Sequence, residues 1–469
     1  MSAEPIYWLK DAAGTGKTTV AATLSRDWLV EKRLAGRFFF TPNSTASSGI
    51  DRFCVTLAKD IAKQVSPLES TVTRALQDSP PTHYGFRQQF QKLVVEPLKL
   101  AKPDMSLILV VDALDNCDPD GREELLHCIL EYLPILPHVK LFLTSRPNPD
   151  IIDILWDSTL VRGREVQLLD INDTVFYDVR VYIQSTLSRL SVDQREQVVR
   201  YSGGLFIVAA TACKLLRWNA EPAKLLSKLM NADKRDHLDE LYLEVLRQAV
   251  SDPAAHELMM KVLKIIITAF QPVSINTIRS FLSESVEVDT FVQDLAAVLK
   301  DGNPDRPIKV LHPTFREFLA AEDRANGFLV NTRSSHALTA IGCLNTLEKL
   351  LDYDPLRLHV KNRVRPRIMD VENLDRRVMQ ATTAALRYAG SYWAYHVAAS
   401  LEDPDVWPKA VQFLSTKLLN WIELMSWRGV LGECIQGLFQ LRIETLKALR
   451  GNDGVLVRIR LYNHRADPH

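Results

Sequence analysis

The first third of the chain alternates short apolar runs with longer segments of helical spacing. Runs typical of strands lie at residues 6–9, 37–40, 107–112 and 139–145. Residues 18–33 and 50–65 carry apolar side chains every three or four positions, which predicts amphipathic helices. The run LILVV at 107–111 is apolar throughout, as expected for a central strand covered on both faces. This alternation predicts an α/β domain with a mostly parallel sheet.

After about residue 165 the strand pattern nearly disappears and helical spacing dominates. Several helical segments are followed by one short apolar run, IKVL at 308–311, and then by the helical stretch PTFREFLAAE, an order that suits a winged-helix module. Farther on we expect only helices, including 386–399 and 410–426, whose Trp and Tyr stripes are more typical of a core than of a ligand site. The predicted domains span residues 1–165, 166–236, 237–325 and 326–469.

Composition and charge exclude some classes of partner. The 469-residue chain has 57 Lys plus Arg and 57 Asp plus Glu, so its net charge gives no reason to expect nucleic acid or an anionic membrane. The spacing of its six cysteines favours reduced thiols over a disulfide framework, and Cys117, His127 and Cys128 lack the spacing of a zinc site. No apolar run approaches the roughly 20 residues that span a bilayer. We therefore expect a cytoplasmic protein without a membrane span.

Residues 11–18, DAAGTGKT, lie between the first predicted strand and the first predicted helix. In the pattern G-x-x-x-x-G-K-[ST], backbone N–H groups cradle phosphates, the lysine reaches the β/γ oxygens and the hydroxyl meets Mg²⁺. Asp11 replaces the first glycine of this pattern. Because Asp enters the left-handed backbone region more readily than most residues, we expect Asp11 to keep the turn, to face away from phosphate and to weaken binding. The predicted phosphate-binding residues are Ala13, Gly14, Thr15, Gly16, Lys17, Thr18 and Thr19.

Two later strands end in residues suited to metal and phosphate chemistry. Asp112 ends the strand LILVVD and is predicted to hold Mg²⁺ together with Thr18, while Asp115 follows where a carboxylate can orient an attacking water. Arg146 follows the strand VKLFLTS, where its guanidinium can sense a γ-phosphate. An acidic turn or a strand stop is ordinary by itself, but after a phosphate loop the catalytic interpretation is favoured. The predicted catalytic residues are Asp112, Asp115 and Arg146.

In this order, WLKDAAGTGKTTVA, LVVDALDNCD and LFLTSRP resemble the NACHT group of STAND-class P-loop NTPases, in particular its fungal NLR-like members with a nephrocystin-3-like N-terminal region. The stretches FRQQFQKLVVEPL, GGLFIVAATACKLL, VLHPTFREFLAAE and YAGSYWAYHV extend the likeness over nearly the whole chain. The resemblance implies an α/β P-loop NTPase domain followed by helical, winged-helix and further helical domains. These close around ADP, and exchange for ATP opens them for oligomerisation. It also implies that His312 touches the β-phosphate of ADP and that Phe206 lies beside the adenine.

Departures from the family pattern shape the expected activity. Asn116 stands where the family has an acidic residue, and an amide cannot accept a proton from water, so hydrolysis should be slow. The loop begins within ten residues of Met1 and no repeat array follows the helices. We therefore expect a switch without effector or sensor domains, either as a fragment or as a regulator of longer NACHT proteins.

The leading hypothesis is a Mg²⁺-dependent ATP/ADP switch, with GTP left open, that controls oligomerisation in fungal self/non-self recognition, innate-immunity-like or cell-death signalling. The alternative is a non-hydrolysing, ADP-bound interaction scaffold. A metabolic kinase would need an acceptor-substrate constellation, which the sequence lacks. DNA binding is disfavoured because the helix SINTIRSFL offers a single arginine.

Overall fold

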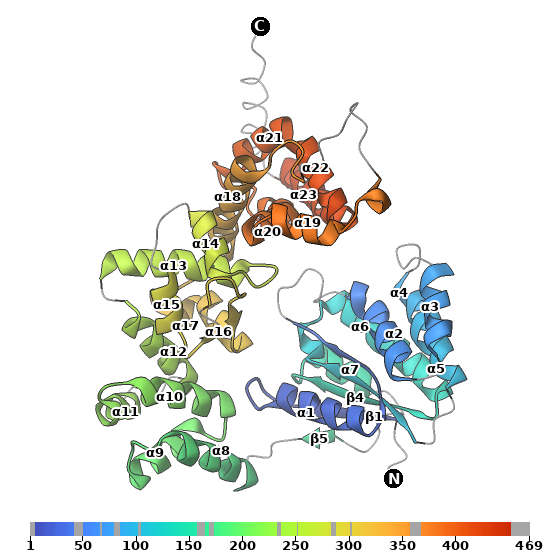
Figure 1. Cartoon of the computed structure of the whole chain (residues 1–469). Coiled ribbons are helices and arrows are strands. Elements are labelled where there is room, and N and C mark those ends of the chain that lie inside the picture. The colour runs from blue at the N-terminus through green and yellow to red at the C-terminus, as the bar shows by residue number, and fades with distance from the viewer. Residues whose placement is uncertain are drawn as a thin grey trace. The chain divides into compact units, whose positions relative to one another are not determined.

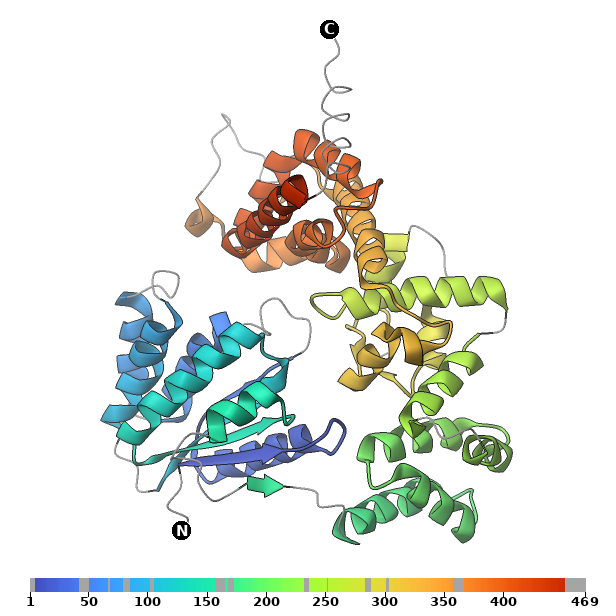
Figure 2. The same cartoon turned by 180° about the vertical axis from the view of Figure 1, so that it is seen from behind.

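A computed structural model gives the architecture of the chain (Figures 1 and 2). It divides into two compact units, Met1–Leu241 and Tyr242–His469. The finer division into four domains stays a prediction. The structure describes residues 5–41, 50–65, 68–78, 85–101, 105–156, 165–167, 173–231, 236–250, 252–282, 288–300, 303–356 and 367–451.

A five-stranded, entirely parallel sheet organises the first unit, with strand order β2-β3-β4-β1-β5. The predicted strands 107–112 and 139–145 are confirmed to the residue, whereas the second strand begins at 34 rather than 37. The short strand β5 was not predicted and extends the sheet past the expected domain end at 165. Three residues are too few to show an alternating pattern. The strands are β1 Ile6–Lys10, β2 Leu34–Phe39, β3 Leu107–Asp112, β4 Val139–Ser145 and β5 Glu165–Gln167.

Helices pack on both faces of this sheet, as the uninterrupted apolar run of β3 predicts; all six residues of β3 are buried. One face is packed by α1, with Leu9, Ile108 and Phe142 in the contact. The helices α2, α4, α6 and α7 contribute to a larger core on the other face. These helices and their neighbours are α1 Lys17–Val30, α2 Phe53–Gln64, α3 Glu69–Asp78, α4 Phe86–Phe90, the π-helical turn Gln91–Val95, α5 Glu96–Leu100, α6 Pro119–Tyr132 and α7 Pro149–Trp156.

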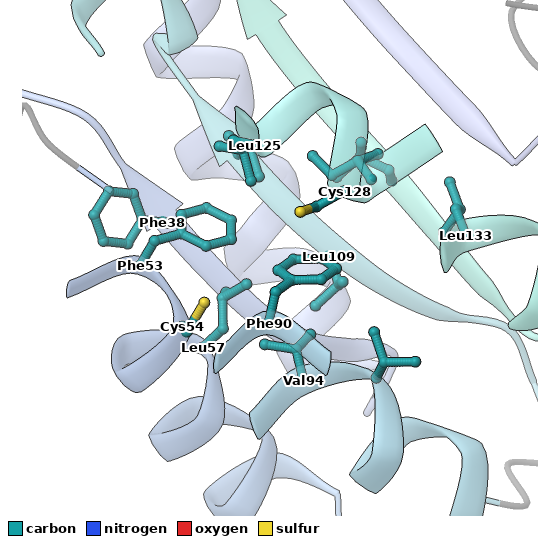
Figure 3. Close-up of a cluster of buried hydrophobic side chains, with 14 of the residues drawn as sticks. Phe38, Phe53, Cys54, Leu57, Phe90, Val94, Leu109, Leu125, Cys128 and Leu133 are labelled. Carbon is teal, nitrogen blue, oxygen red and sulfur yellow. The ribbon is translucent and has the colours of Figure 1, made fainter. Parts of the chain in front are cut away.

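Aromatic rings form the centre of the larger core. Phe53 of α2 contacts Phe38 of β2 and Phe90 of α4, with ring centroids 5.0 and 6.3 Å apart (Figure 3). Cys54 and Cys128 lie in the same cluster. All six cysteines of the chain are free and buried, which agrees with the expectation of reduced thiols.

The first unit continues with helices after the sheet. Helix α9 has a capping box in which Ser191 and Gln194 satisfy each other's backbone amides, and it ends at Gly203 with φ 55°. The helices are α8 Asp173–Thr186, α9 Val192–Ser202, α10 Phe206–Trp218, α11 Pro222–Met230 and α12 His237–Gln248, the last of which reaches into the second unit.

The second unit begins with helices followed by a two-stranded antiparallel ribbon. The predicted run 308–311 contains one strand of this ribbon, and the next helix begins at Pro313 as expected. This order of elements is the one expected for a winged helix, an assignment that stays a prediction. The elements are α13 Pro253–Thr268, α14 Ile275–Leu282, α15 Val288–Asp294, β6 Leu299–Lys300, β7 Lys309–Val310, α16 Pro313–Ala320 and α17 Glu322–Ala325.

The remaining described chain is helical. The segment 410–426, expected as one helix, is two helices that separate at Lys417, whose ψ of 0° departs from helical values. Trp393 and Trp421 are fully buried with perpendicular rings 6.0 Å apart, so these aromatic side chains are core residues. None of the helices in the described parts of the chain is long and apolar enough to cross a membrane. They are α18 Thr332–Leu350, α19 Leu374–Ala381, α20 Ala384–Ala398, α21 Val406–Thr416, α22 Leu418–Trp427 and α23 Leu431–Gly451.

Candidate functional site

The loop between β1 and α1 has the backbone of a phosphate cradle. Gly14 and Gly16 have φ of 83° and 95°, in the left-handed region where a side chain is strained. A Cβ on Gly16 would meet nothing within 4 Å, so the backbone angle, and not crowding, requires glycine there. Gly16 also caps the N-terminus of α1, where unpaired amides and the helix dipole favour an anion.

Lys17 lies directly over this loop. Its side chain is buried, and its Nζ donates to the carbonyl oxygens of Asp11 and Ala12 at 2.6 and 2.7 Å. Burial lowers the pKa of Lys17, an effect that the carboxylates of Asp115 and Asp11 oppose. The ammonium group is therefore held at the loop by two neutral acceptors, which a phosphate oxygen can replace.

Asp11 behaves differently from the sequence-based expectation. Its φ is not positive, so it does not take the left-handed conformation predicted for it. Its Oδ1 accepts a hydrogen bond from the Ala12 amide at 2.6 Å, and its Oδ2 is buried and has no hydrogen-bond partner among the described residues. The predicted left-handed conformation is wrong because Gly14 and Gly16 provide the left-handed positions of the loop. The carboxylate of Asp11 instead occupies the backbone N–H of Ala12, a donor of the loop.

Asp112 lies at the carboxyl end of β3, beside the start of α1. It is 1% exposed, its Oδ1 accepts from Thr144 Oγ1 at 2.6 Å, and the Thr18 hydroxyl also hydrogen-bonds to it. Burial raises the pKa of Asp112, while these two hydrogen bonds oppose the rise. The pair Thr18 and Asp112 supplies one hydroxyl and one carboxylate, hard oxygen donors that fit a largely hydrated Mg²⁺.

Thr144 is a site residue that sequence reasoning did not assign. Besides donating to Asp112, its hydroxyl oxygen accepts from the backbone N–H of Ala113 at 2.9 Å, and Ala113 has a φ of 56°. One side chain thus fixes both the carboxylate and the turn behind it. The signal that could have indicated Thr144 is the expected parallel sheet, because parallel neighbours such as β3 and β4 end at the same edge.

Asp115 and Arg146, predicted as separate catalytic groups, are paired with each other. The backbone N–H of Arg146 donates to Asp115 Oδ1 at 3.0 Å, and its Nε lies 3.1 Å from Oδ2. The Asp115 side chain is 9% exposed and that of Arg146 is 29% exposed. Asp115 lies in the short helical turn Leu114–Asn116 that follows β3. The two groups therefore form one unit at the edge of the sheet that carries the loop.

The other two predicted nucleotide contacts have local roles. Phe206 begins α10, and its ring lies 6.4 Å from that of Tyr182. His312 is the N-cap of α16: its Nδ1 accepts from the Thr314 amide at 3.3 Å and lies 2.7 Å from Thr314 Oγ1. The roles of Phe206 beside adenine and of His312 at the β-phosphate stay predictions. In the described part of the chain, no group of three or more His, Cys, Asp or Glu side chains is arranged to hold a metal.

The geometry agrees with comparisons to known proteins. The family model "Nephrocystin 3, N-terminal" matches residues 1–146, which include β1 to β4, the loop, Asp112, Asp115 and Arg146. The vegetative incompatibility protein HET-E-1 of Podospora anserina is 24% identical over 403 residues. The chain is therefore similar to the nephrocystin-3 N-terminal family over residues 1–146 and to HET-E-1 over a longer stretch. The match covers 75% of this chain and 28% of HET-E-1, so the chain spans under a third of that relative's length.

Two solved structures are also similar to this chain. The Walker-type ATPase PABY2304 of Pyrococcus abyssi has a TM-score of 0.32 at 14% identity, over 67% of this chain and 90% of that one. A STAND protein with a tetratricopeptide repeat sensor from Pyrococcus horikoshii has a TM-score of 0.43 at 15% identity, over 99% of this chain and 66% of that one.

Proposed function

We propose that this chain is a nucleotide-controlled switch that binds ADP or ATP with Mg²⁺ and hydrolyses ATP slowly. The observation that carries the proposal is the meeting of Lys17, Thr18 and Asp112 around a loop with two left-handed glycines. A structural loop has no need of a buried ammonium group above it and a buried carboxylate beside it. A phosphate chain with its cation needs both.

Each residue has a distinct role in this proposal. Amides of the loop and of the start of α1 bind the β-phosphate, and Lys17 exchanges its two carbonyl acceptors for β/γ oxygens. Thr18 and Asp112 hold Mg²⁺, which neutralises charge on the phosphates. Asp115 orients the attacking water, and Arg146 contacts the γ-phosphate after leaving Asp115.

The output that we propose is regulated assembly. The relative HET-E-1 is named for vegetative incompatibility, which favours self/non-self recognition or cell death as the process and protein copies or longer NACHT proteins as partners. Coupling requires ADP and ATP to bind the closed and open forms with different affinities, because equal affinities shift no equilibrium. His312 is proposed to hold the ADP-bound form. The buried free thiols of the protein support a location in the reducing cytoplasm.

Fluorescent mant-ADP binding to the purified chain tests the central proposal. Lys17→Ala is expected to weaken binding by about 100-fold or more, because it removes a charge-assisted contact from a buried position. Lys59→Ala is a matched control, since Lys59 is exposed on α2. Similar affinities for all three proteins, or no nucleotide binding by the wild-type chain, would refute the proposal.

Asp11 offers a second test of the same loop. Asp11→Gly is expected to tighten nucleotide binding by about tenfold, since it frees the Ala12 amide and removes an anion near the phosphates. Asp11→Asn keeps an acceptor without the charge and should fall between the two. Unchanged or weaker binding by Asp11→Gly would show that the carboxylate does not compete with phosphate.

The second candidate is a scaffold that retains ADP without turnover. The pairing of Asp115 with Arg146 favours it, because both groups are occupied with each other. Single-turnover phosphate release separates the candidates. A switch releases phosphate within minutes to hours, whereas a scaffold keeps its nucleotide and releases none.

A further inference from the structure

Arg122 connects the turn that carries Asp115 to the start of α7. It lies in the first turn of α6 with a side chain only 7% exposed. Its Nε and Nη2 contact Asp150 Oδ2 at 2.7 and 2.5 Å, and its Nη1 donates to the carbonyl oxygens of Asp115 and Cys117 at 3.2 and 3.3 Å. One guanidinium group therefore holds two backbone positions of the turn and one carboxylate of α7.

The contacts of Arg122 form a closed ring with the pair already described. The Asp115 carboxylate is held by Arg146, and the Asp115 carbonyl is held by Arg122. Arg146 and Asp150 are four residues apart on the segment that leads from β4 into α7. Two Arg–Asp pairs thus link the same two segments. In the inner pair, Asp115 of the first segment contacts Arg146 of the second. In the outer pair, Arg122 of the first segment contacts Asp150 of the second, so the acidic and basic partners are exchanged.

We infer that Arg122 and Asp150 are positioning residues that keep Arg146 and Asp115 in place for the γ-phosphate. This inference rests on the proposed function, in which the inner pair separates when Arg146 turns to phosphate. The segment of Arg146 then loses its charged link to Asp115. The outer pair remains and keeps that segment against the turn.

The two pairs differ in a way that suits these roles. The outer pair is anchored by the more buried arginine, which has two backbone acceptors in addition to Asp150. The inner pair has the more exposed arginine, at 29% against 7%, and its guanidinium contact to Asp115 is longer. The charge-assisted bonds of a buried guanidinium in a fixed fork hold geometry better than those of a partly exposed guanidinium. The inner pair is therefore the exchangeable one.

Asp150→Asn tests the inference with little risk to folding, because the Asp150 side chain is 44% exposed. The readout is the ratio of the dissociation constants for mant-ADP and for the non-hydrolysable triphosphate mant-AMPPNP. Asp150→Asn is expected to leave ADP affinity within about threefold, because the loop and Lys17 are untouched. It should weaken the triphosphate by roughly tenfold, the effect usual for a residue that orients a charged site group. Asp150→Glu keeps the charge and should restore the wild-type ratio.

Two comparisons separate positioning from general stability. Glu131→Gln breaks another ion pair of α6, with Arg87, and should change neither the ratio nor the ADP affinity. A merely structural Asp150 would lower the melting temperature and weaken both nucleotides equally. That result, or an unchanged ratio for Asp150→Asn, would overturn the inference. If Lys17→Ala abolished nucleotide binding while Asp150→Asn left the ratio of the two dissociation constants unchanged, the proposed function would stand. Only the positioning role of Arg122 and Asp150 would be refuted.

Discussion

A buried histidine pair is expected to make the stability of the second unit depend on pH. The Phe270 N–H donates to Tyr388 Oη at 3.1 Å, Tyr388 Oη lies 2.9 Å from His396 Nε2, and His396 Nδ1 lies 2.9 Å from His336 Nδ1. Two neutral imidazoles satisfy all of these contacts in one arrangement, in which Tyr388 donates to His396 Nε2 and His396 donates from Nδ1 to His336 Nδ1.

Burial opposes a charge on either ring. It lowers the pKa of His336 to about 4 and that of His396 well below its usual value, and a charge on His336 lowers the pKa of His396 further. Protonation of His336 Nδ1 would also place two N–H donors face to face. The groups whose charges act on Tyr388 are Cys343, Tyr392 and Arg316. Arg316 donates to the carbonyl oxygens of α13 and supplies no acceptor for an imidazolium.

The size of the effect follows from the two protonation states. In the unfolded chain His336 has a pKa near 6.5, whereas in the folded chain its pKa is about 4. The stability that the neutral His336 contributes is therefore complete above pH 6.5 and is lost as the pH falls toward 4. For His336 alone, the free energy of unfolding falls by about 1.4 kcal/mol between pH 8 and pH 5.5, and by about 2.6 kcal/mol by pH 4.5. His396 acts in the same direction.

The measurement uses urea titrations with pulse labelling of buried thiols, read by mass spectrometry. Labelling of Cys343 in α18 reports the second unit, and labelling of Cys54 in α2 reports the first unit in the same sample. The test variant is His336→Asn, whose amide oxygen can take the place of the accepting Nδ1 but does not titrate. The exposed His127→Asn on α6 controls for the loss of one imidazole.

The expected result is a change with pH in the stability difference between the wild type and His336→Asn. His336→Asn loses ring contacts with Phe270, so it is less stable at pH 8. Its deficit relative to the wild type should shrink by about 1.4 kcal/mol at pH 5.5, and only at Cys343. If the wild type and His336→Asn lost stability in parallel between these pH values, His336 would not contribute to the response.

Substitutions at three positions test the packing and capping of single helices. Gly342→Ala in α18 should destabilise the second unit by about 1–3 kcal/mol in the same urea titration, because its methyl would lie 2.6 Å from Phe281 Cβ and 3.0 Å from its Cα. Gly390→Ala should stay within about 1 kcal/mol of the wild type, since the close atom is the mobile methyl of Met425 and alanine favours the helix; a loss as large as for Gly342→Ala would contradict this. Ser191→Ala should lower the stability of the first unit by about 1 kcal/mol by removing the cap of α9, and Ser191→Asp should retain it.

Features that depend on near neighbours along the chain were predictable from the sequence. The strands at 107–112 and 139–145 were predicted to the residue because their apolar runs are long and bounded by polar turns. The phosphate loop was predicted because two glycines, a lysine and a threonine at fixed spacing specify a local backbone. Helical spacing likewise identified helices such as α1, α2 and α20, but it could not show the break at Lys417.

Contacts between groups that are far apart in the sequence could be learned only from the folded chain. Strand order sets Thr144 beside Asp112, and the parallel edge of β3 and β4 joins Asp115 to Arg146. The conformation of Asp11 was predicted wrongly from its own propensity, because the shape of the loop is set by its glycines and its carboxylate bonds the next amide. A pairing energy between side chains thirty residues apart leaves no periodic trace in a sequence, since it exists only once the sheet has brought the two strand ends together.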